Sequence, residues 1–228
     1  MKEIEAPFAR YVDGVNLKLL RIVGLDVDET VTRSAEKYVT YIETHFGIQP
    51  RWEAIRQVGL TKAYPELREE QTEEALAATW SDPDNFPELI DPHIPDIIKD
   101  LTDDGGVFQY IFVPLTSSKG DIGNIISYLR QNGIPFPDYM YKGNKAEKAQ
   151  AWVNPHLEDS LEIGAACGKL GKVVLAITND VNRERQQQEL GGFSSVHITD
   201  WSHVAHLLRK DLTVLGQLGL TAELASVI

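Results

Sequence analysis

Short apolar runs that alternate with helical patterns constrain the fold of this chain most strongly. Runs with strand character occupy residues 22–25, 108–115, 173–177 and 196–198, and a helical pattern follows each of them. Runs of this length without polar alternation are typical of strands that are buried on both faces of a parallel sheet. The repeated strand–helix units therefore predict an α/β fold with a doubly wound, Rossmann-like parallel sheet and right-handed crossovers.

The interval between the first two predicted strands is long and lacks strand character. Residues from about 33 to 93 show helical patterns, and prolines punctuate the end of this stretch. We therefore predict an α/β core domain formed by residues 1–32 and 94–228, and a helical cap domain formed by residues 33–93 and inserted into that core. The first helix of the insert is predicted to take Ser34 as its N-cap and to end at Gly47.

Three aromatic residues of the insert have two interpretations. Trp52, Tyr64 and Trp80 either line a substrate pocket or form the core of the insert. Aromatic residues at helical spacing more often belong to a core, because their large apolar rings gain most from burial.

The charge of the chain excludes two classes of partner. The formal net charge is −12 over 228 residues, whereas proteins that hold nucleic acid polymers or anionic lipid surfaces need an excess of positive charge. We therefore expect no nucleic acid polymer and no membrane as partner. Whether the chain forms a homo-oligomer stays open at this point.

Cysteine content and hydropathy indicate a compartment. The single cysteine, Cys167, lies among small residues, so no internal disulfide and no thiolate metal cluster can form, and a packing role is expected. The N-terminus lacks the apolar core of a signal peptide, and no apolar run approaches the length of a membrane span. The expected location is the cytoplasm.

Polar residues follow directly after the first predicted strand. Asp26 and Asp28 are one residue apart, and Thr30 is two further on. The carboxyl ends of parallel strands are where α/β folds place their functional groups, and two carboxylates there either repel each other or share a cation. The alternative is a strand that leads into a polar turn, since Asp and Thr are common in turns and helix caps.

Two later strand ends carry polar residues as well. Thr116 and Ser117 follow the second strand, and Glu158 and Asp159 end a brief strand near residue 157. Each group has a structural alternative, because hydroxyls cap helices and acids favour the first turn of a helix. Three lysines precede the second acidic pair: Lys142, Lys145 and Lys148.

In this order, the motifs resemble those of the haloacid dehalogenase-like (HAD) superfamily of phosphohydrolases. Asp26-Val27-Asp28-Glu29-Thr30 matches an Asp-x-Asp-x-Thr motif, Thr116 matches a strand-end Thr or Ser, and Glu158-Asp159 matches an acidic pair. Lys145 is our choice for the motif lysine, with Lys142 and Lys148 as rivals. The resemblance covers roughly residues 20–205, and the insert lies where this superfamily often carries a helical cap.

The resemblance implies a role for each matched residue. Asp26 would be the nucleophile that forms an aspartyl-phosphate, and Asp28 the general acid and base. Thr116, Ser117 and Lys145 would hold the phosphoryl oxygens.

The cofactor implied by the resemblance is Mg²⁺. Its ligands would be Asp26, the backbone carbonyl of Asp28, and Asp159, with Glu158 acting through a metal-bound water. The cation would offset the repulsion between an attacking carboxylate and an anionic phosphate.

The resemblance therefore implies a Mg²⁺-dependent phosphomonoester hydrolase that acts on a small phosphorylated substrate. A similarity around residues 178–183 to the deoxyribonucleotidase-like branch suggests a nucleoside monophosphate as substrate. The alternatives are a phosphatase or phosphomutase for a sugar phosphate or another small metabolite, and a non-catalytic member of the fold that binds a partner.

Overall fold

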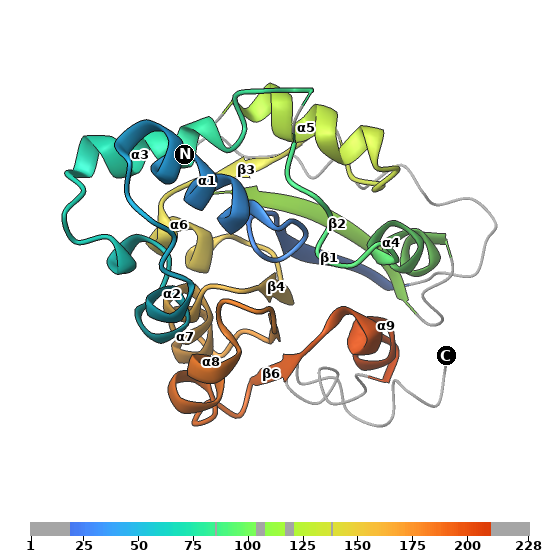
Figure 1. Cartoon of the computed structure of the whole chain (residues 1–228). Helices are drawn as coiled ribbons and strands as arrows, with labels where there is room; N and C mark the ends of the chain where they lie inside the picture. Colours follow the sequence, from blue (N-terminus) through green and yellow to red (C-terminus); the bar gives the residue numbers. More distant parts are fainter. Residues whose placement is uncertain (1–18, 85, 104–107, 117–120, 138, 211–228) are drawn as a thin grey trace, which may run out of the picture.

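The computed structural model describes residues 19–84, 86–103, 108–116, 121–137 and 139–210. Its centre is a six-stranded sheet in which every neighbouring pair is parallel, in the order β3-β2-β1-β4-β5-β6 (Figure 1). This confirms the predicted parallel sheet. The strands are β1 (Leu19–Asp26), β2 (Phe108–Thr116), β3 (Tyr141–Lys142), β4 (His156–Glu158), β5 (Val174–Ile177) and β6 (Val196–Thr199).

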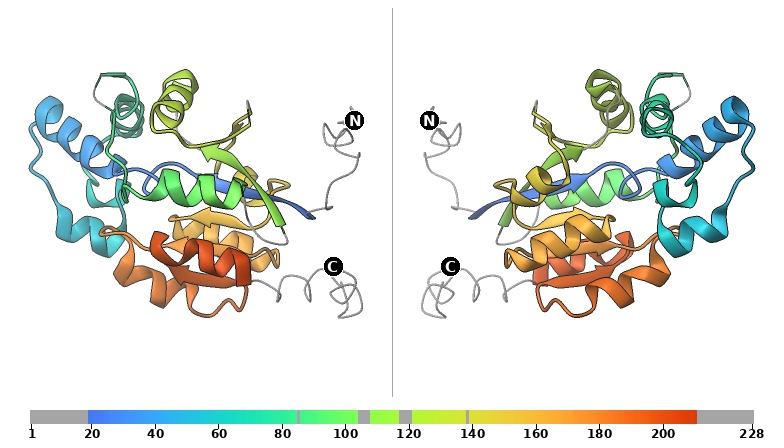
Figure 2. Two further views of the ribbon diagram at one scale, coloured as in Figure 1. Left: turned by 90° about the vertical axis from the view of Figure 1, so that its right-hand side faces the viewer. Right: turned by 90° about the vertical axis from the view of Figure 1, so that its left-hand side faces the viewer.

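Helices connect the strands and cover both faces of the sheet (Figure 2). In chain order they are α1 (Ser34–Phe46), α2 (Trp52–Val58), the short 3₁₀ helix η1 (Thr61–Ala63), α3 (Glu69–Ala78), α4 (Ile94–Asp103), α5 (Ile122–Gln131), α6 (Lys145–Gln150), α7 (Leu161–Lys169), α8 (Arg183–Leu190) and α9 (Trp201–Lys210).

Side chains that alternate along β5 show that the sheet is buried on two sides. Leu175 and Ile177 pack into the cluster that includes α4, α5 and α9, whereas Val174 and Ala176 pack against α6, α7 and α8. Successive side chains of a strand point to opposite faces, so these two helical groups lie on opposite faces of the sheet. This arrangement confirms the predicted doubly wound architecture.

Helices α1, α2 and α3, together with η1, lie beyond the carboxyl ends of the strands (Figures 1 and 2). They enclose a hydrophobic cluster of their own around Tyr38, Ile42, Ile55 and Tyr64, separate from the core clusters on the two faces of the sheet. Trp80 instead belongs to the core cluster on the α4 face. Tyr64 and Trp80 are thus core residues, while the division into domains at residues 33–93 stays a prediction.

The first cap helix begins differently from the prediction. Ser34 is the first residue of α1 rather than its N-cap, and Arg33, the residue before it, makes no side-chain cap. Glu29 takes that role from outside the helix, because its Oε1 accepts hydrogen bonds from the Ala35 amide at 2.5 Å and from the Ser34 hydroxyl at 3.3 Å. Gly47 ends the helix with φ of 67°, as predicted.

Cys167 is buried in the hydrophobic cluster that joins α7 to α6, α8 and β5, which agrees with its predicted packing role. In the ranges described above, no helix combines the length and the apolar character that a membrane crossing requires.

Close packing at the centre of the sheet generates a prediction. A Cβ at Gly24 of β1 would lie 2.7 Å from both Leu115 Cδ1 and Val153 Cγ2, whereas a Cβ at Gly164 of α7 would meet Leu190 at an ordinary 3.4 Å. We expect Gly24→Ala to lower the free energy of unfolding by about 1–3 kcal/mol through overpacking. Gly164→Ala, the matched control, should leave it unchanged or raise it by up to about 1 kcal/mol, because alanine favours a helix.

Urea unfolding of the two variants and the parent checks this expectation. Equal midpoints for Gly24→Ala and the parent would contradict it.

Candidate active site

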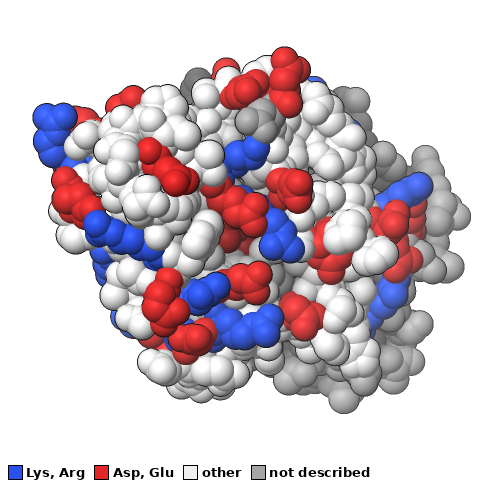
Figure 3. Space-filling view, viewed as in Figure 1, with Lys and Arg blue, Asp and Glu red and all other residues white. Residues whose placement is uncertain are grey.

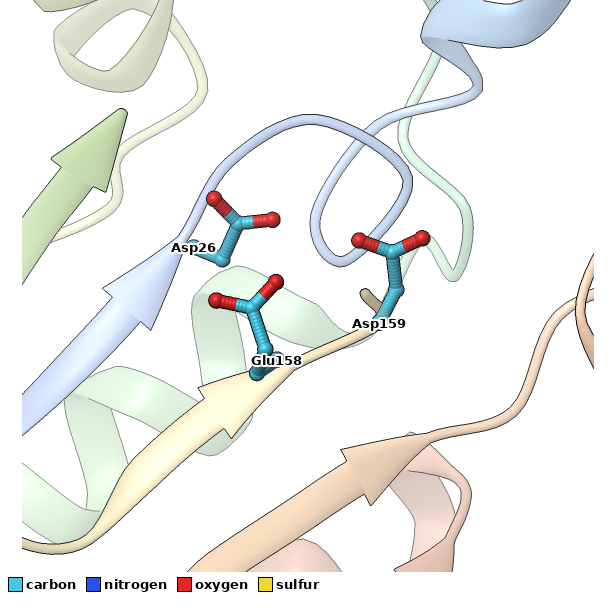
Figure 4. A group of neighbouring side chains, drawn as sticks. All are labelled: Asp26, Glu158 and Asp159. Carbon is cyan, nitrogen blue, oxygen red and sulfur yellow. The ribbon is translucent and has the colours of Figure 1, made fainter. Parts of the chain in front are cut away.

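Three acidic side chains meet where two neighbouring strands end. Asp26 is the last residue of β1, Glu158 is the last residue of β4, and Asp159 follows it. Their carboxyl groups face one another (Figure 4), and one oxygen from each lies within 4.8 Å of the others. Residues more than 130 positions apart in the sequence therefore share one edge of the sheet, as the parallel topology predicts.

A buried lysine lies inside this acidic group. Lys148 Nζ donates a hydrogen bond to Asp26 Oδ1 and lies 3.4 Å from Glu158 Oε2, and its side chain is 2% exposed. The lysine comes from α6, which Asn144 caps by accepting a hydrogen bond from the Glu147 amide. The buried part of this helix includes Lys148 and Ala149.

The choice of lysine made from the sequence is corrected by this geometry. Lys145 is 55% exposed and pairs with Glu162 Oε2 at 2.7 Å, and Lys142 is exposed as well. Spacing from the acidic pair does not separate Lys145 from Lys148, because both belong to the same short helix. Only the packing of α6 against the sheet decides which ammonium reaches Asp26.

The loop after β1 positions Asp28 beside this group. Asp28 Oδ1 accepts a hydrogen bond from Trp80 Nε1 at 2.8 Å. Thr30 Oγ1 donates to Asp26 Oδ2 at 3.2 Å, so the threonine of the first motif holds the first aspartate. Asp26 thereby accepts hydrogen bonds at both of its oxygens.

Residues far away in the sequence hold the same loop through hydrogen bonds to its backbone. Trp201 Nε1 of α9 donates to the Thr30 carbonyl at 2.7 Å, and Asn179 Nδ2 donates to the Glu29 carbonyl at 2.8 Å. Glu29 has a φ of 56°, a left-handed conformation that is unfavourable for a residue with a Cβ. These tertiary hydrogen bonds stabilise the turn that presents Asp26 and Asp28.

The acidic pair after β4 is also held by its neighbours. Glu158 Oε1 accepts a hydrogen bond from the Ser160 amide at 3.1 Å. Asn182 Nδ2 donates to the backbone carbonyl of Asp159 at 3.2 Å and to that of Ile177 at 3.0 Å, which joins the ends of β4 and β5. The segment 178–183 therefore supports the site from the neighbouring strand.

Burial and mutual repulsion perturb the ionisation of the carboxyl groups. Burial, reinforced by the nearby Asp26 carboxylate, raises the pKa of Asp28 to about 6 and that of Glu158 to about 8. The same two causes raise the pKa of Asp159 well above its usual range. Burial lowers the pKa of the Lys148 ammonium, but the attraction of Asp26 and Glu158 outweighs it and raises the pKa above the usual value. Such perturbed groups cluster at functional sites.

The donor set suits a hard divalent cation. Asp26, Glu158 and Asp159 offer carboxylate oxygens within 4.8 Å of one another. Glu158 Oε2 is buried and accepts no hydrogen bond from the described residues, so it can accept a further positive partner. Oxygen ligands of this kind are those that Mg²⁺ prefers.

A pocket of about 670 Å³ opens over these residues. Acidic and basic side chains lie intermixed on the face seen in Figure 3. The floor of the pocket includes Asp26, Lys148 and Asp159. Its walls include residues of α1, η1 and α3 and residues next to these helices: Ser34, Tyr38, Leu60, Thr61, Glu69, Glu73, Leu76 and Thr79.

The remaining predicted site residues are placed as follows. Thr116 is buried at the end of β2, the strand next to β1, and Ser117 lies outside the described residues. Trp80, Asn179 and Trp201 support the site from outside its motifs, and no local pattern in the sequence relates them to Asp28, Glu29 or Thr30. They are recognised only through contacts across 52, 150 and 171 residues.

This chain resembles known proteins in its structure but not detectably in its sequence. No family model and no curated protein matches the sequence. A predicted phosphatase from Clostridium acetobutylicum is similar with a TM-score of 0.57 and 18% identity, over 86% of this chain and 99% of that one. A haloacid dehalogenase-like family hydrolase from Streptococcus pneumoniae is similar with a TM-score of 0.55 and 16% identity, over 82% of this chain and 98% of that one.

Neither of these structures is named as a nucleotidase, so that part of the resemblance gains no support from them. The parallel sheet and the meeting of Asp26 with Asp159 at one edge of it agree with the fold that the motifs implied. The described part of this chain has the fold of the haloacid dehalogenase-like hydrolases.

Proposed function

We propose that this protein is a phosphomonoesterase that acts through an aspartyl-phosphate intermediate. The observation that carries the proposal is the contact of Lys148 with Asp26, next to Glu158 and Asp159, on the floor of a pocket. A carboxylate that attacks phosphorus must approach an anionic group, and a fixed ammonium beside it lowers that electrostatic cost.

The proposed chemistry uses the two aspartates of the first motif in different roles. A carboxylate oxygen of Asp26 attacks phosphorus, and the bond between phosphorus and the leaving oxygen breaks. Asp28 gives its proton to that oxygen and later takes a proton from the water that hydrolyses the aspartyl-phosphate. A carboxyl with a pKa raised to about 6 suits such work, because it can hold and release a proton near neutral pH.

The phosphoryl group would be held by residues around the first strand end. Lys148 replaces Lys145 in this role, and Thr116 at the end of β2 is the strand-end hydroxyl that the motif assigns to it. These donors would stabilise charge that spreads over the phosphoryl oxygens in the transition state.

We propose Mg²⁺ as the cofactor, held by Asp26, Asp159 and the backbone carbonyl of Asp28, with Glu158 acting through water. The buried carboxyl groups fit a divalent cation, since in their ionised forms they would together carry more negative charge than Lys148 alone can balance. When bound, the ion would offset repulsion between the Asp26 carboxylate and the substrate phosphate.

The substrate is proposed to be a small phosphorylated metabolite, and the pocket of about 670 Å³ can accommodate one. A nucleoside monophosphate is the first candidate, on the motif similarity alone. A sugar phosphate is the second, and a phosphomutase reaction would use the same aspartyl-phosphate step. A protein that only binds a partner through this fold would show no turnover.

Removal of the nucleophile tests the proposed chemistry. We expect the parent protein with Mg²⁺ to release phosphate from at least one member of a panel of small phosphomonoesters. Asp26→Asn should lower kcat by at least about 1,000-fold, because an amide cannot attack phosphorus. Phosphate release is measured with Mg²⁺ and with EDTA, and absence of metal-dependent turnover on every substrate would refute the enzymatic proposal.

The two lysines of α6 form a matched pair for a second test. We expect Lys148→Ala to lower kcat/KM by about 100-fold or more, because it removes the ammonium that contacts Asp26. Lys145→Ala should lower it by at least about tenfold less than Lys148→Ala does, because Lys145 lines the pocket but its ammonium pairs with Glu162 and does not contact Asp26. Steady-state kinetics of both variants show which lysine binds the phosphoryl group. A larger loss in Lys145→Ala than in Lys148→Ala would assign this role to Lys145.

Metal binding has a readout that does not depend on turnover. At about 100 times its Kd, Mg²⁺ should stabilise the parent by about 2.7 kcal/mol, which corresponds to a rise in Tm of about 5–10 °C. Asp159→Asn should remove most of that rise, whereas Glu162→Gln, outside the carboxylate group, should keep it.

In EDTA we expect Asp159→Asn to unfold at the parent's Tm or above it. Burial and neighbouring carboxylates raise the pKa of Asp159, so its charged form is unfavourable in the folded protein. Thermal unfolding curves with Mg²⁺ and with EDTA give both results. An equal Mg²⁺-induced rise in the parent and in Asp159→Asn would exclude this residue as a ligand.

A further inference from the structure

We propose that Trp80 is a positioning residue that determines which oxygen of Asp28 releases the proton to the leaving group. The proposal rests on the phosphomonoesterase function proposed above and adds to it a residue that belongs to none of the motifs. It is carried by one buried hydrogen bond, from Trp80 Nε1 to Asp28 Oδ1 at 2.8 Å.

The indole is held rigidly in the core. Trp80 is fully buried. Its ring packs edge to face against Tyr128, with centroids 5.4 Å apart, and in a tilted arrangement against Phe86, with centroids 6.0 Å apart. Its backbone carbonyl accepts a hydrogen bond from Asn124 Nδ2 of α5 at 2.7 Å. Both the ring and the backbone of Trp80 are therefore fixed by the core.

The position of Trp80 in the chain gives this contact its significance. Helix α3 ends at Ala78, and Trp80 lies where the chain returns from the cap to the core cluster on the α4 face. The indole N–H therefore reaches Asp28 from a segment that is anchored to the core rather than from the cap helices.

An indole N–H differs from other hydrogen-bonding groups because it only donates. Asp28 Oδ1 must accept from it, so a proton carried by the Asp28 carboxyl group sits on Oδ2. The hydroxyl of Ser34, which also lines the pocket, donates its proton to Glu29 Oε1 at 3.3 Å.

The proton transfer then has a defined course. As the bond between phosphorus and the leaving oxygen breaks, the electron pair stays on that oxygen, which takes the proton from Asp28 Oδ2. The carboxylate that results keeps its hydrogen bond from Trp80 at Oδ1. In the second half-reaction Oδ2 recovers a proton from the water that attacks the aspartyl-phosphate. Trp80 itself exchanges no proton.

Dependence on the leaving group separates positioning from a merely structural role. An alkyl phosphate needs a proton on its departing oxygen, whereas p-nitrophenyl phosphate releases a stable anion without one. Loss of packing should slow formation of the aspartyl-phosphate from both substrates alike. Loss of a positioned acid should slow this step selectively for the alkyl phosphate.

We expect Trp80→Phe, which keeps an aromatic ring and removes the N–H, to lower kcat/KM on an alkyl phosphate by about 10–100-fold. This ratio reports the steps up to formation of the aspartyl-phosphate, so the shared hydrolysis step does not enter it. The kcat/KM on p-nitrophenyl phosphate should stay within about threefold of the parent value. Asn124→Ala keeps the indole but removes its backbone anchor, and should show a smaller loss with the same selectivity. Trp52→Phe, the matched control, should leave the ratio of the two rates unchanged, because Trp52 is outside the pocket over Asp28.

Equal losses on the two substrates, or no loss on either, would overturn the positioning role of Trp80. If Trp80→Phe fails to fold, Asn124→Ala takes its place in the test, and a loss that is not selective for the alkyl phosphate would overturn the positioning role. Asp28→Asn should give the largest selective loss, and a non-selective effect there would overturn the acid role of Asp28 and the proposal with it. A parent that hydrolyses neither substrate nor any member of the phosphomonoester panel would refute the proposed function, and the role of Trp80 would fall with it.

Discussion

The contact between the Lys148 ammonium and the carboxylates of Asp26 and Glu158 is the interaction on which the site depends. Burying these charges is costly, and their attraction compensates only when the geometry is held closely. The sheet supplies that geometry by placing the ends of β1 and β4 side by side, and α6 supplies the cation. With Asp159 beside them, the acids still exceed the single lysine, so the site favours a further cation and an anionic substrate held with it.

The topology of the sheet explains why so many side-chain hydrogen bonds hold the loops around the site. In a parallel sheet all strands end at one edge, so segments from distant parts of the chain must be held against each other there. Trp201, Asn179 and Asn182 do this by donating hydrogen bonds to backbone carbonyls, which leaves the acidic side chains available for chemistry. The left-handed conformation at Glu29 persists because such contacts hold its loop on both sides.

The cap and the core contribute differently to the pocket. Helices α1, α2 and α3 have their own hydrophobic cluster and form one wall, with Tyr38, Leu60 and Leu76. Glu29 links the two parts, because it follows Asp28 and also accepts hydrogen bonds from the Ala35 amide and the Ser34 hydroxyl at the start of α1. Trp80 belongs to the core cluster although it follows the last cap helix, so the orientation of Asp28 is coupled to the core rather than to the cap helices.

The sequence by itself determined five of the six strands, the alternation of strands and helices, and the acids at two strand ends, because these depend on apolar runs and short-range spacing. The two-residue strand β3 was not predicted, because it is too short to form an apolar run. Asp26 and Asp159 could be paired in advance, since parallel strands end at one edge. The tertiary structure decided which lysine contacts Asp26, because Lys145 and Lys148 belong to one short helix and only its packing buries one of them. It also decided that Glu29 caps α1 and that Trp80 holds Asp28. These contacts join groups that no local pattern relates, and the hydrogen bonds that a buried polar group must find are set by three-dimensional proximity rather than by sequence spacing.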